Sequence, residues 1–235
     1  ELNTTVKGVK VRISEVTEFP FSNTIKYQVQ ADKPVSFSLK IRKPAWVKGF
    51  KLNSNFTEKE GYIIIIKTWN DNETIQLDLI AEPEIKQDRN KENYFSYGAL
   101  VFALPVESKE VITKKYPVEG LNDLEYEPVN LILYRLSSSE ETETTVIHVE
   151  APGKVWNSII LKTKLINSKT DKAENVELLP LGGTILRQET FPNEVYTSSG
   201  TIKRYNNFPS EFVNSRKVDV WLPDGYDVKK KYTVL

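Results

Sequence analysis

The sequence predicts an all-β protein with two antiparallel β-sandwich units and a C-terminal β-hairpin segment. Apolar residues recur mostly at every second position, which is the period of a strand with one buried face. Proline, glycine, asparagine and aspartate gather between these stretches and predict turns. No helical pattern extends convincingly beyond three turns. Short strands separated by turns at near-regular spacing are typical of β-sandwiches.

The first unit is predicted to span residues 1–108. Four of its segments alternate between apolar and polar side chains, at residues 9–13, 25–29, 35–41 and 74–80. Two others, residues 62–66 and 98–104, are almost continuously apolar. A continuous apolar run of this length predicts a strand that is buried on both faces.

The second unit is predicted to span residues 109–192. Its expected strands lie at residues 129–134, 145–150, 158–166, 175–179 and 184–190. Residues 114–128 are polar and irregular, and they contain Pro117, Gly120 and Pro128. This composition predicts a linker or long loop between the two sheet units.

Residues 193–235 are predicted to be a connector followed by the opening strands of a further domain. The two expected strands of a hairpin lie at residues 201–205 and 216–222, and a tight turn follows at 223–227. The apolar residues 232–235 would begin the next strand. Because the sequence starts at Glu1, contains no methionine and ends within this run, we expect it to be an internal piece of a larger protein.

Charge and composition limit the possible partners. The chain carries 32 basic and 32 acidic residues, so its formal net charge is zero. A neutral chain has no long-range field that attracts nucleic acid or an anionic membrane, and neither is predicted as a partner. No run approaches the roughly 18 apolar residues that a membrane span needs. The abundance of lysine, asparagine and isoleucine is typical of bacterial proteins.

The residue types for most catalytic chemistry are missing. The chain has no cysteine, which excludes disulfides, thiolate zinc sites and cysteine nucleophiles within it. Its one histidine, His148, lies in the alternating segment 145–150 and is predicted to be a solvent-facing strand residue rather than a general base. No phosphate-binding glycine loop, nucleophile elbow or calcium loop is present. We therefore predict no catalytic residue, no metal site and no cofactor.

Aromatic side chains offer the one candidate binding site. The four tryptophans are expected to pack in or between sheets, since each buries a large area. Trp46 is the best candidate for an exposed ring that stacks on a sugar, because Pro44 ends a strand just before it. Arg42 and Tyr94 are the other candidate carbohydrate contacts.

Several short motifs follow one another in a fixed order through residues 1–192. They are Val11–Ile13 with Phe19–Phe21, Lys40–Trp46, Gly61–Ile63 with Trp69, Tyr97–Ala103, Val149–Ala151 with Trp156, and Leu179–Pro192. Together they resemble the region that follows the catalytic barrel in β-L-arabinofuranosidase-like glycoside hydrolases. Two positions depart from the family pattern: its Gly-Asp is Asn72-Glu73 here, and its Gly-Pro is Gly98-Ala99.

This resemblance implies a position next to an active site rather than an active site. In that family an (α/α) barrel precedes β-sandwich domains, and the metal-binding cysteines and glutamate, including the nucleophile, belong to the barrel. None of those motifs is in this sequence, so no catalytic residue is carried over. The resemblance implies that the chain buttresses the barrel of its own polypeptide in a periplasmic or secreted enzyme, with a plant-type polysaccharide as a candidate ligand.

The tail is similar to a different family. Arg216–Tyr226, followed by Lys231–Leu235, looks like the opening of esterase-D-like α/β-hydrolases. That likeness implies a parent in which a glycosidase and a carbohydrate esterase are fused, with the esterase nucleophile beyond residue 235.

Three hypotheses follow from the sequence. The first is a non-catalytic support module of a bacterial carbohydrate-active enzyme, which we favour. The second is a free-standing carbohydrate-binding module that uses Trp46 or Tyr94. The third is a fragment of a carbohydrate esterase.

Overall fold

The computed structural model describes residues 1–137, 143–150, 156, 158–193, 200–209, 211, 214–223 and 225–231. These residues form antiparallel strands and one short 3-10 helix, Leu181–Gly183, and no α-helix occurs among them. The all-β prediction is therefore confirmed. The chain divides into two compact units, Glu1–Asn193 and Glu194–Leu235.

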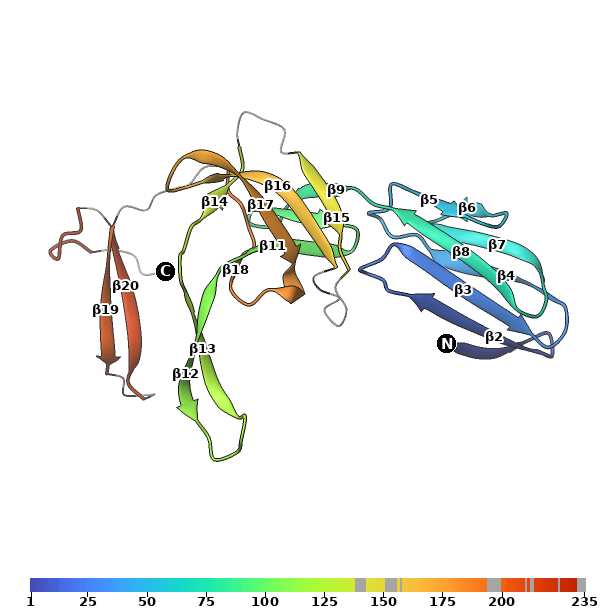
Figure 1. The fold of residues 1–235 in the computed structure, drawn as a ribbon, viewed down its shortest axis with the longest axis horizontal. Coiled ribbons are helices and arrows are strands. Elements are labelled where there is room, and N and C mark those ends of the chain that lie inside the picture. Colours follow the sequence, from blue (N-terminus) through green and yellow to red (C-terminus); the bar gives the residue numbers. More distant parts are fainter. Residues whose placement is uncertain are drawn as a thin grey trace. The chain divides into compact units, whose positions relative to one another are not determined.

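The first sandwich consists of two antiparallel sheets (Figure 1, blue to cyan). One sheet has the order β1 (Leu2–Val6), β2 (Val9–Thr17), β3 (Thr24–Ala31), β8 (Glu73–Ile80) and β5 (Gly49–Leu52). The other has the order β4 (Val35–Arg42), β7 (Tyr62–Trp69) and β6 (Thr57–Lys59). The alternating segments predicted from the sequence are all strands here.

One core lies between these two sheets. The five-stranded sheet contributes Val29, Ile75 and Leu77, and the three-stranded sheet contributes Ile63 and Ile65. Each of these strands turns alternate side chains inward, because successive residues of a strand point to opposite faces. The strands are held in register by two-residue turns at Lys7-Gly8 and Glu60-Gly61, where all four φ angles are positive, as a type I′ hairpin requires.

Strand β7 differs from its prediction. Ile63 and Ile65 are fully buried, but Tyr62 is 43% exposed and Ile66 is 70% exposed. The expectation that residues 62–66 are buried on both faces is therefore wrong for the described chain. The reason is that a second sheet covers only the inner face of β7.

The second core is built from strands that are far apart in sequence. Its sheet has the order β14 (Tyr134–Arg135), β16 (Ile159–Asn167), β17 (Lys172–Pro180), β11 (Leu100–Pro105), β10 (Asn93–Tyr97) and β9 (Pro83–Gln87). Strand β15 (Thr144–His148) pairs with β16, and β18 (Arg187–Gln188) pairs with β11.

The residues of this core show that the second sheet begins before the expected boundary, which was placed between residues 108 and 109. Phe95 and Phe102 pack with Leu161, Leu178 and Phe191 in one cluster. Strand β11 also pairs directly with β17. A boundary after residue 108 would divide this sheet, because β9 to β11 precede that residue and β14 to β18 follow it.

Residues 108–128 form a hairpin and not the expected linker. Strands β12 (Ser108–Lys115) and β13 (Asn122–Pro128) pair with each other (Figure 1, light green). Pro117 and Gly120 lie in the turn, where they interrupt no ladder, so the turn residues that suggested a linker are compatible with paired strands. The strand expected at 129–134 is reduced to its last residue, and the one at 184–190 to Arg187–Gln188.

The compact unit Glu194–Leu235 contains the predicted C-terminal hairpin. Strands β19 (Gly200–Phe208) and β20 (Arg216–Pro223) are antiparallel neighbours. Arg204 donates to both carboxylate oxygens of Asp219, at 2.7 Å each, across this pair. The strand expected at residues 232–235 lies outside the described residues.

Candidate functional site

Trp46, the candidate sugar platform, is half-buried and packs against the first core. Its ring is stacked with that of Phe19, with ring centroids 6.4 Å apart and planes 13° apart. Gly98, which has a φ of +58°, also lies close to the indole, since a Cβ built there would be 3.7 Å from two of its carbons. Part of the surface that a sugar would need is therefore occupied by the protein itself.

The other two candidates lie on different sheets. Arg42 is exposed at the end of β4, where it pairs in register with Tyr62 of β7. Tyr94 is half-buried in β10 and pairs with Lys86 of β9. In the described part of the chain, no hydrogen bond or ring contact joins any two of Arg42, Trp46 and Tyr94. The structure thus places Arg42 beside Tyr62, a ring that the sequence reading did not select as a contact.

The segment between β2 and β3 connects the two cores of the compact unit Glu1–Asn193. It contains the cis peptide Phe19-Pro20. Phe19 lies on Trp46, whereas Phe21 packs against the second core and meets the Trp156 ring edge-on, with centroids 4.9 Å apart. The Asn23 amide donates to the Tyr97 hydroxyl at 3.2 Å. The apolar triplet that carried part of the family resemblance is therefore a packing element between sandwiches.

An ion pair adds to this junction. Lys48 follows Trp46 closely in sequence, and its ammonium group binds the carboxylate of Glu84 on β9. Lys86 binds the second oxygen of the same carboxylate at 2.9 Å. Hydrogen bonds from these two lysines lower the pKa of Glu84 from 4.5 to about 2. Glu84 is thus an anion held by two cations, which is an arrangement for stability rather than for proton transfer.

A hollow of about 460 Å³ lies beside the same segment and includes the single histidine. Glu18, Asn23, Tyr97 and His148 are among its lining residues. His148 is an exposed residue of β15, as its alternating segment predicted. Burial raises the pKa of Tyr97 above its usual value of 10. The polar side chains of Glu18, Asn23, Tyr97 and His148 give this hollow hydrogen-bonding groups.

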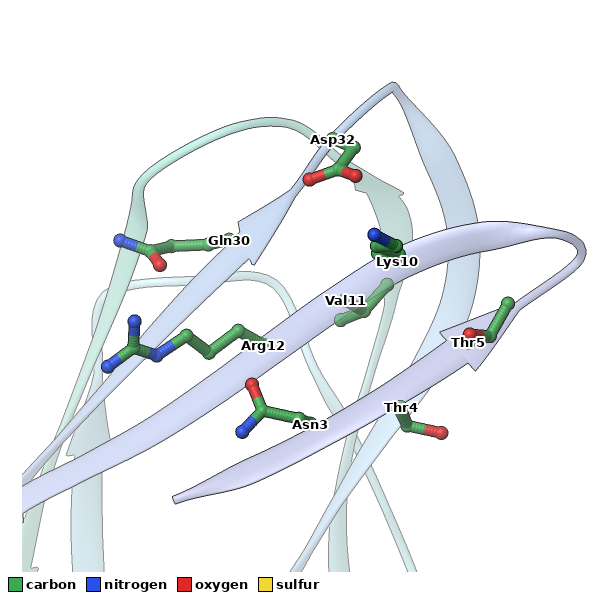
Figure 2. A pocket seen from close by; sticks show the side chains of 8 residues that line it. All are labelled: Asn3, Thr4, Thr5, Lys10, Val11, Arg12, Gln30 and Asp32. Atoms are coloured by element: carbon green, nitrogen blue, oxygen red, sulfur yellow. The ribbon is translucent and has the colours of Figure 1, made fainter.

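A second polar hollow of about 460 Å³ lies on the outer face of the five-stranded sheet (Figure 2). Figure 2 shows Asn3, Arg12 and Gln30 on three neighbouring strands, where they are cross-strand partners. The Arg12 guanidinium is engaged by Glu1 at 2.6 Å. Hydrogen bonds from Asn3 and Arg12 lower the pKa of Glu1. No aromatic ring lines this hollow, so it has hydrogen-bonding groups without a stacking surface.

Within the described residues, no group of three or more His, Asp or Glu side chains is placed to hold a metal ion. The same residues contain no helix that is long and apolar enough to cross a membrane.

Comparison with known proteins connects this fold to one class of enzyme. Residues 1–80 match the family model described as the middle domain of GH127 β-L-arabinofuranosidase. This segment is the first sandwich, with all strands from β1 to β8. No curated protein sequence matches the chain.

Solved structures share the fold at low sequence identity. A GH127 β-L-arabinofuranosidase from Geobacillus stearothermophilus T6 aligns with 80% of the chain at 16% identity and a TM-score of 0.53. A second GH127 β-arabinofuranosidase aligns with 82% at 15% identity and a TM-score of 0.56. A protein described as a glycoside hydrolase aligns with 81% at 17% identity and a TM-score of 0.51.

The chain spans only about a third of those proteins, between 31% and 34% of their length. The resemblance of the β-sandwich region to the arabinofuranosidase family is therefore supported by both comparisons. Neither of them supports the esterase-like reading of the tail.

Proposed function

We propose that this chain is the non-catalytic β-sandwich part of a larger arabinofuranosidase-like glycoside hydrolase. The observation that carries the proposal is the match of residues 1–80 to the middle domain of that family. The share of the similar solved structures that the chain covers, about a third, is compatible with an accessory region. The partner that we propose is the catalytic barrel of the same polypeptide.

The use of its aromatic residues supports a structural role. Trp69 is fully buried in the first core, Phe21 packs on the second core, and Trp46 is close to both Phe19 and Gly98. A carbohydrate-binding module presents such rings to solvent instead. Trp46, the side chain that the sequence offered as a sugar platform, thus contributes to packing within the chain.

The test compares two polypeptides, residues 1–235 and the product of the whole gene. We expect the longer product to hydrolyse a nitrophenyl β-L-arabinofuranoside and residues 1–235 to leave it intact. Removal of residues 1–193 from the longer product should lower the Tm of what remains, because a buttressing surface is lost. Saturable hydrolysis by residues 1–235 that one substitution abolishes would overturn the proposal.

The same deletion separates support from binding. A carbohydrate-binding role predicts that the deletion leaves Tm and kcat/KM on the small substrate unchanged but removes adsorption to a plant-type polysaccharide. That result would replace our proposal with the carbohydrate-binding hypothesis.

A further inference from the structure

The outer face of the three-stranded sheet carries an aromatic ring between two cations. Tyr62 of β7 pairs in register with Arg42 of β4 on one side and with Lys59 of β6 on the other. Directly opposed residues of antiparallel strands point to the same face, with Cβ atoms about 5 Å apart. All three side chains are exposed. The row therefore presents a phenol ring flanked by a guanidinium and an ammonium group.

A second row adds another cation and a shallow hollow. Lys40 pairs with Ile64, two residues along each strand from Arg42 and Tyr62, and so lies on the same face. A hollow of about 330 Å³ is lined by Lys40, Lys59, Glu60, Tyr62 and Ile64. This volume lies at the lower end of the range for small-ligand sites, which runs from about 300 to 1,000 Å³.

The charge of this face is largely uncompensated. In the described part of the chain no ion pair joins Lys40 or Arg42 to a carboxylate. Lys59 is 3.7 Å from Glu60, and both side chains are more than two-thirds exposed, so this contact is weak. Two cations, Lys40 and Lys59, and one carboxylate line the hollow, and Arg42 adds a third cation on the same face, although the whole chain has no net charge.

We propose that this face binds a carboxylated glycan, meaning an oligosaccharide that contains uronic acid. The ring of Tyr62 would support the C–H face of one sugar. Arg42 offers the planar pair of donors that matches a carboxylate, and Lys40 and Lys59 add point charges on both sides. The choice of a glycan over other anions rests on the proposed function, whereas the site itself rests on the strand register.

The test is a titration of residues 1–235 with short oligogalacturonates, followed by calorimetry or by NMR shifts of the β4, β6 and β7 amides. We expect weak, saturable binding that weakens as sodium chloride is raised, because exposed charges are screened. The same oligosaccharides with their carboxyl groups reduced to alcohols should bind at least about tenfold more weakly, since the charge-assisted hydrogen bonds are lost.

Matched variants locate the site. Tyr62→Ala and Arg42→Gln should each weaken binding by about tenfold, while Tyr62→Phe, which keeps the ring, should bind nearly as the parent chain does. Glu60→Gln should strengthen binding, because it removes the one carboxylate at the hollow. A tightening of this kind is a result that a merely structural role for these residues does not produce.

Ile66 is the control for an apolar contribution from outside the hollow. It lies on the same face of β7, two residues beyond Ile64 and away from the hollow. Ile66→Ser should leave glycan binding unchanged. If Ile66→Ser weakens binding as much as Tyr62→Ala, binding is not confined to the hollow and its cations, and the proposal is wrong.

Two further results would also overturn it: equal binding of the reduced oligosaccharides, or no binding of the acidic ones. Either outcome leaves the support role untouched, because that role is tested by the deletion and its effect on Tm. Conversely, loss of the support role with intact uronate binding would leave this site standing as a glycan-binding face.

Discussion

The two faces of strand β7 are made of the same kinds of residue but differ in what lies opposite them. Ile63, Ile65 and Trp69 point inward and are fully buried against the five-stranded sheet. Tyr62 and Ile66 point outward and remain exposed, with Ile64 half-buried between them. The difference teaches that burial in a strand is decided by the layer that packs on it, and residue type alone does not determine it.

The largest effect is expected at Trp69. Its side chain is fully buried, its ring stacks on Phe37 with centroids 5.3 Å apart, and its indole nitrogen donates to the Phe37 carbonyl at 3.1 Å. Trp69→Ala should lower the free energy of unfolding by about 4 kcal/mol, because it leaves a cavity and an unpaired carbonyl. Urea denaturation followed by circular dichroism measures this. Tyr62→Ala on the opposite face is the control and should cost less than about 0.5 kcal/mol.

A sharper form of the comparison uses two neighbouring isoleucines. Ile65 is fully buried and Ile66 is 70% exposed. Ile65→Ala should destabilise the chain by about 3 kcal/mol, whereas Ile66→Ala should change its stability by less than about 0.5 kcal/mol. Equal losses from the two substitutions would mean that the outer face of β7 is packed in solution, and the contrast drawn here would fail.

The first sandwich was predictable because its information is local. Strict alternation in residues 25–29 and 74–80 gives both the strand and its inward face. The turn residues Glu60 and Gly61 adopt the conformation that a two-residue hairpin needs. The short strands β1, β5 and β6 were not predicted. The outer face of β7 was misassigned, because the absence of a covering layer leaves no mark in the strand's own sequence.

The second sheet was harder to predict because it depends on distant pairings. Phe95 meets Phe191 with ring centroids 5.3 Å apart, and β11 pairs with β17, across long separations in the chain. Single-sequence periodicity carries no information about such partners, so the boundary at residues 108 and 109 was misplaced. The hairpin β12–β13 was missed because Pro117 and Gly120 signal a turn without showing that the flanking strands pair with each other.

The candidate site was predicted in part. Arg42 was selected from the sequence, and it is exposed on the face that we propose as a glycan site. Trp46 was selected with it, but a proline before a tryptophan does not show that Phe19 and Gly98 will cover the ring. Tyr62 was treated as part of a buried run. Tyr62 lies directly opposite Arg42 on the same face of the sheet, and this position could have identified it as a contact. That inference requires knowing that β4 pairs with β7.

An intermediate effect is expected at the junction between the cores. Trp46 is half-buried, so Trp46→Ala should cost about 2 kcal/mol, roughly half the loss at a fully buried tryptophan. Differential scanning calorimetry should show a lower Tm for the first unit. The matched control is Trp221→Ala in the unit Glu194–Leu235, where the ring is 51% exposed. This substitution should leave the Tm of the unit Glu1–Asn193 unchanged. An unchanged Tm for Trp46→Ala would show that the indole is dispensable to the junction and would return it to the list of sugar contacts.

The smallest effect is electrostatic and depends on pH. The pKa of Glu84 is about 2 in the folded chain, below its ordinary value of 4.5, because Lys48 and Lys86 hold the charged form. A depressed pKa contributes stability that is complete above a pH of about 4.5 and is lost as the pH falls toward about 2. The difference in Tm between the parent chain and Glu84→Gln should therefore be small near neutral pH, shrink across this acidic range, and shrink with added salt because the groups are partly exposed.

Other carboxylates titrate over the same range, so the comparison needs a double-mutant cycle. Lys48→Gln, Glu84→Gln and the double variant isolate the coupling between these two side chains. We expect a coupling that is present at neutral pH and absent below a pH of about 2, since protonated Glu84 no longer attracts Lys48. A coupling that did not change with pH would show that the contact is held by packing. The pair would then resemble the inner face of β7 rather than the solvated charges of its outer face.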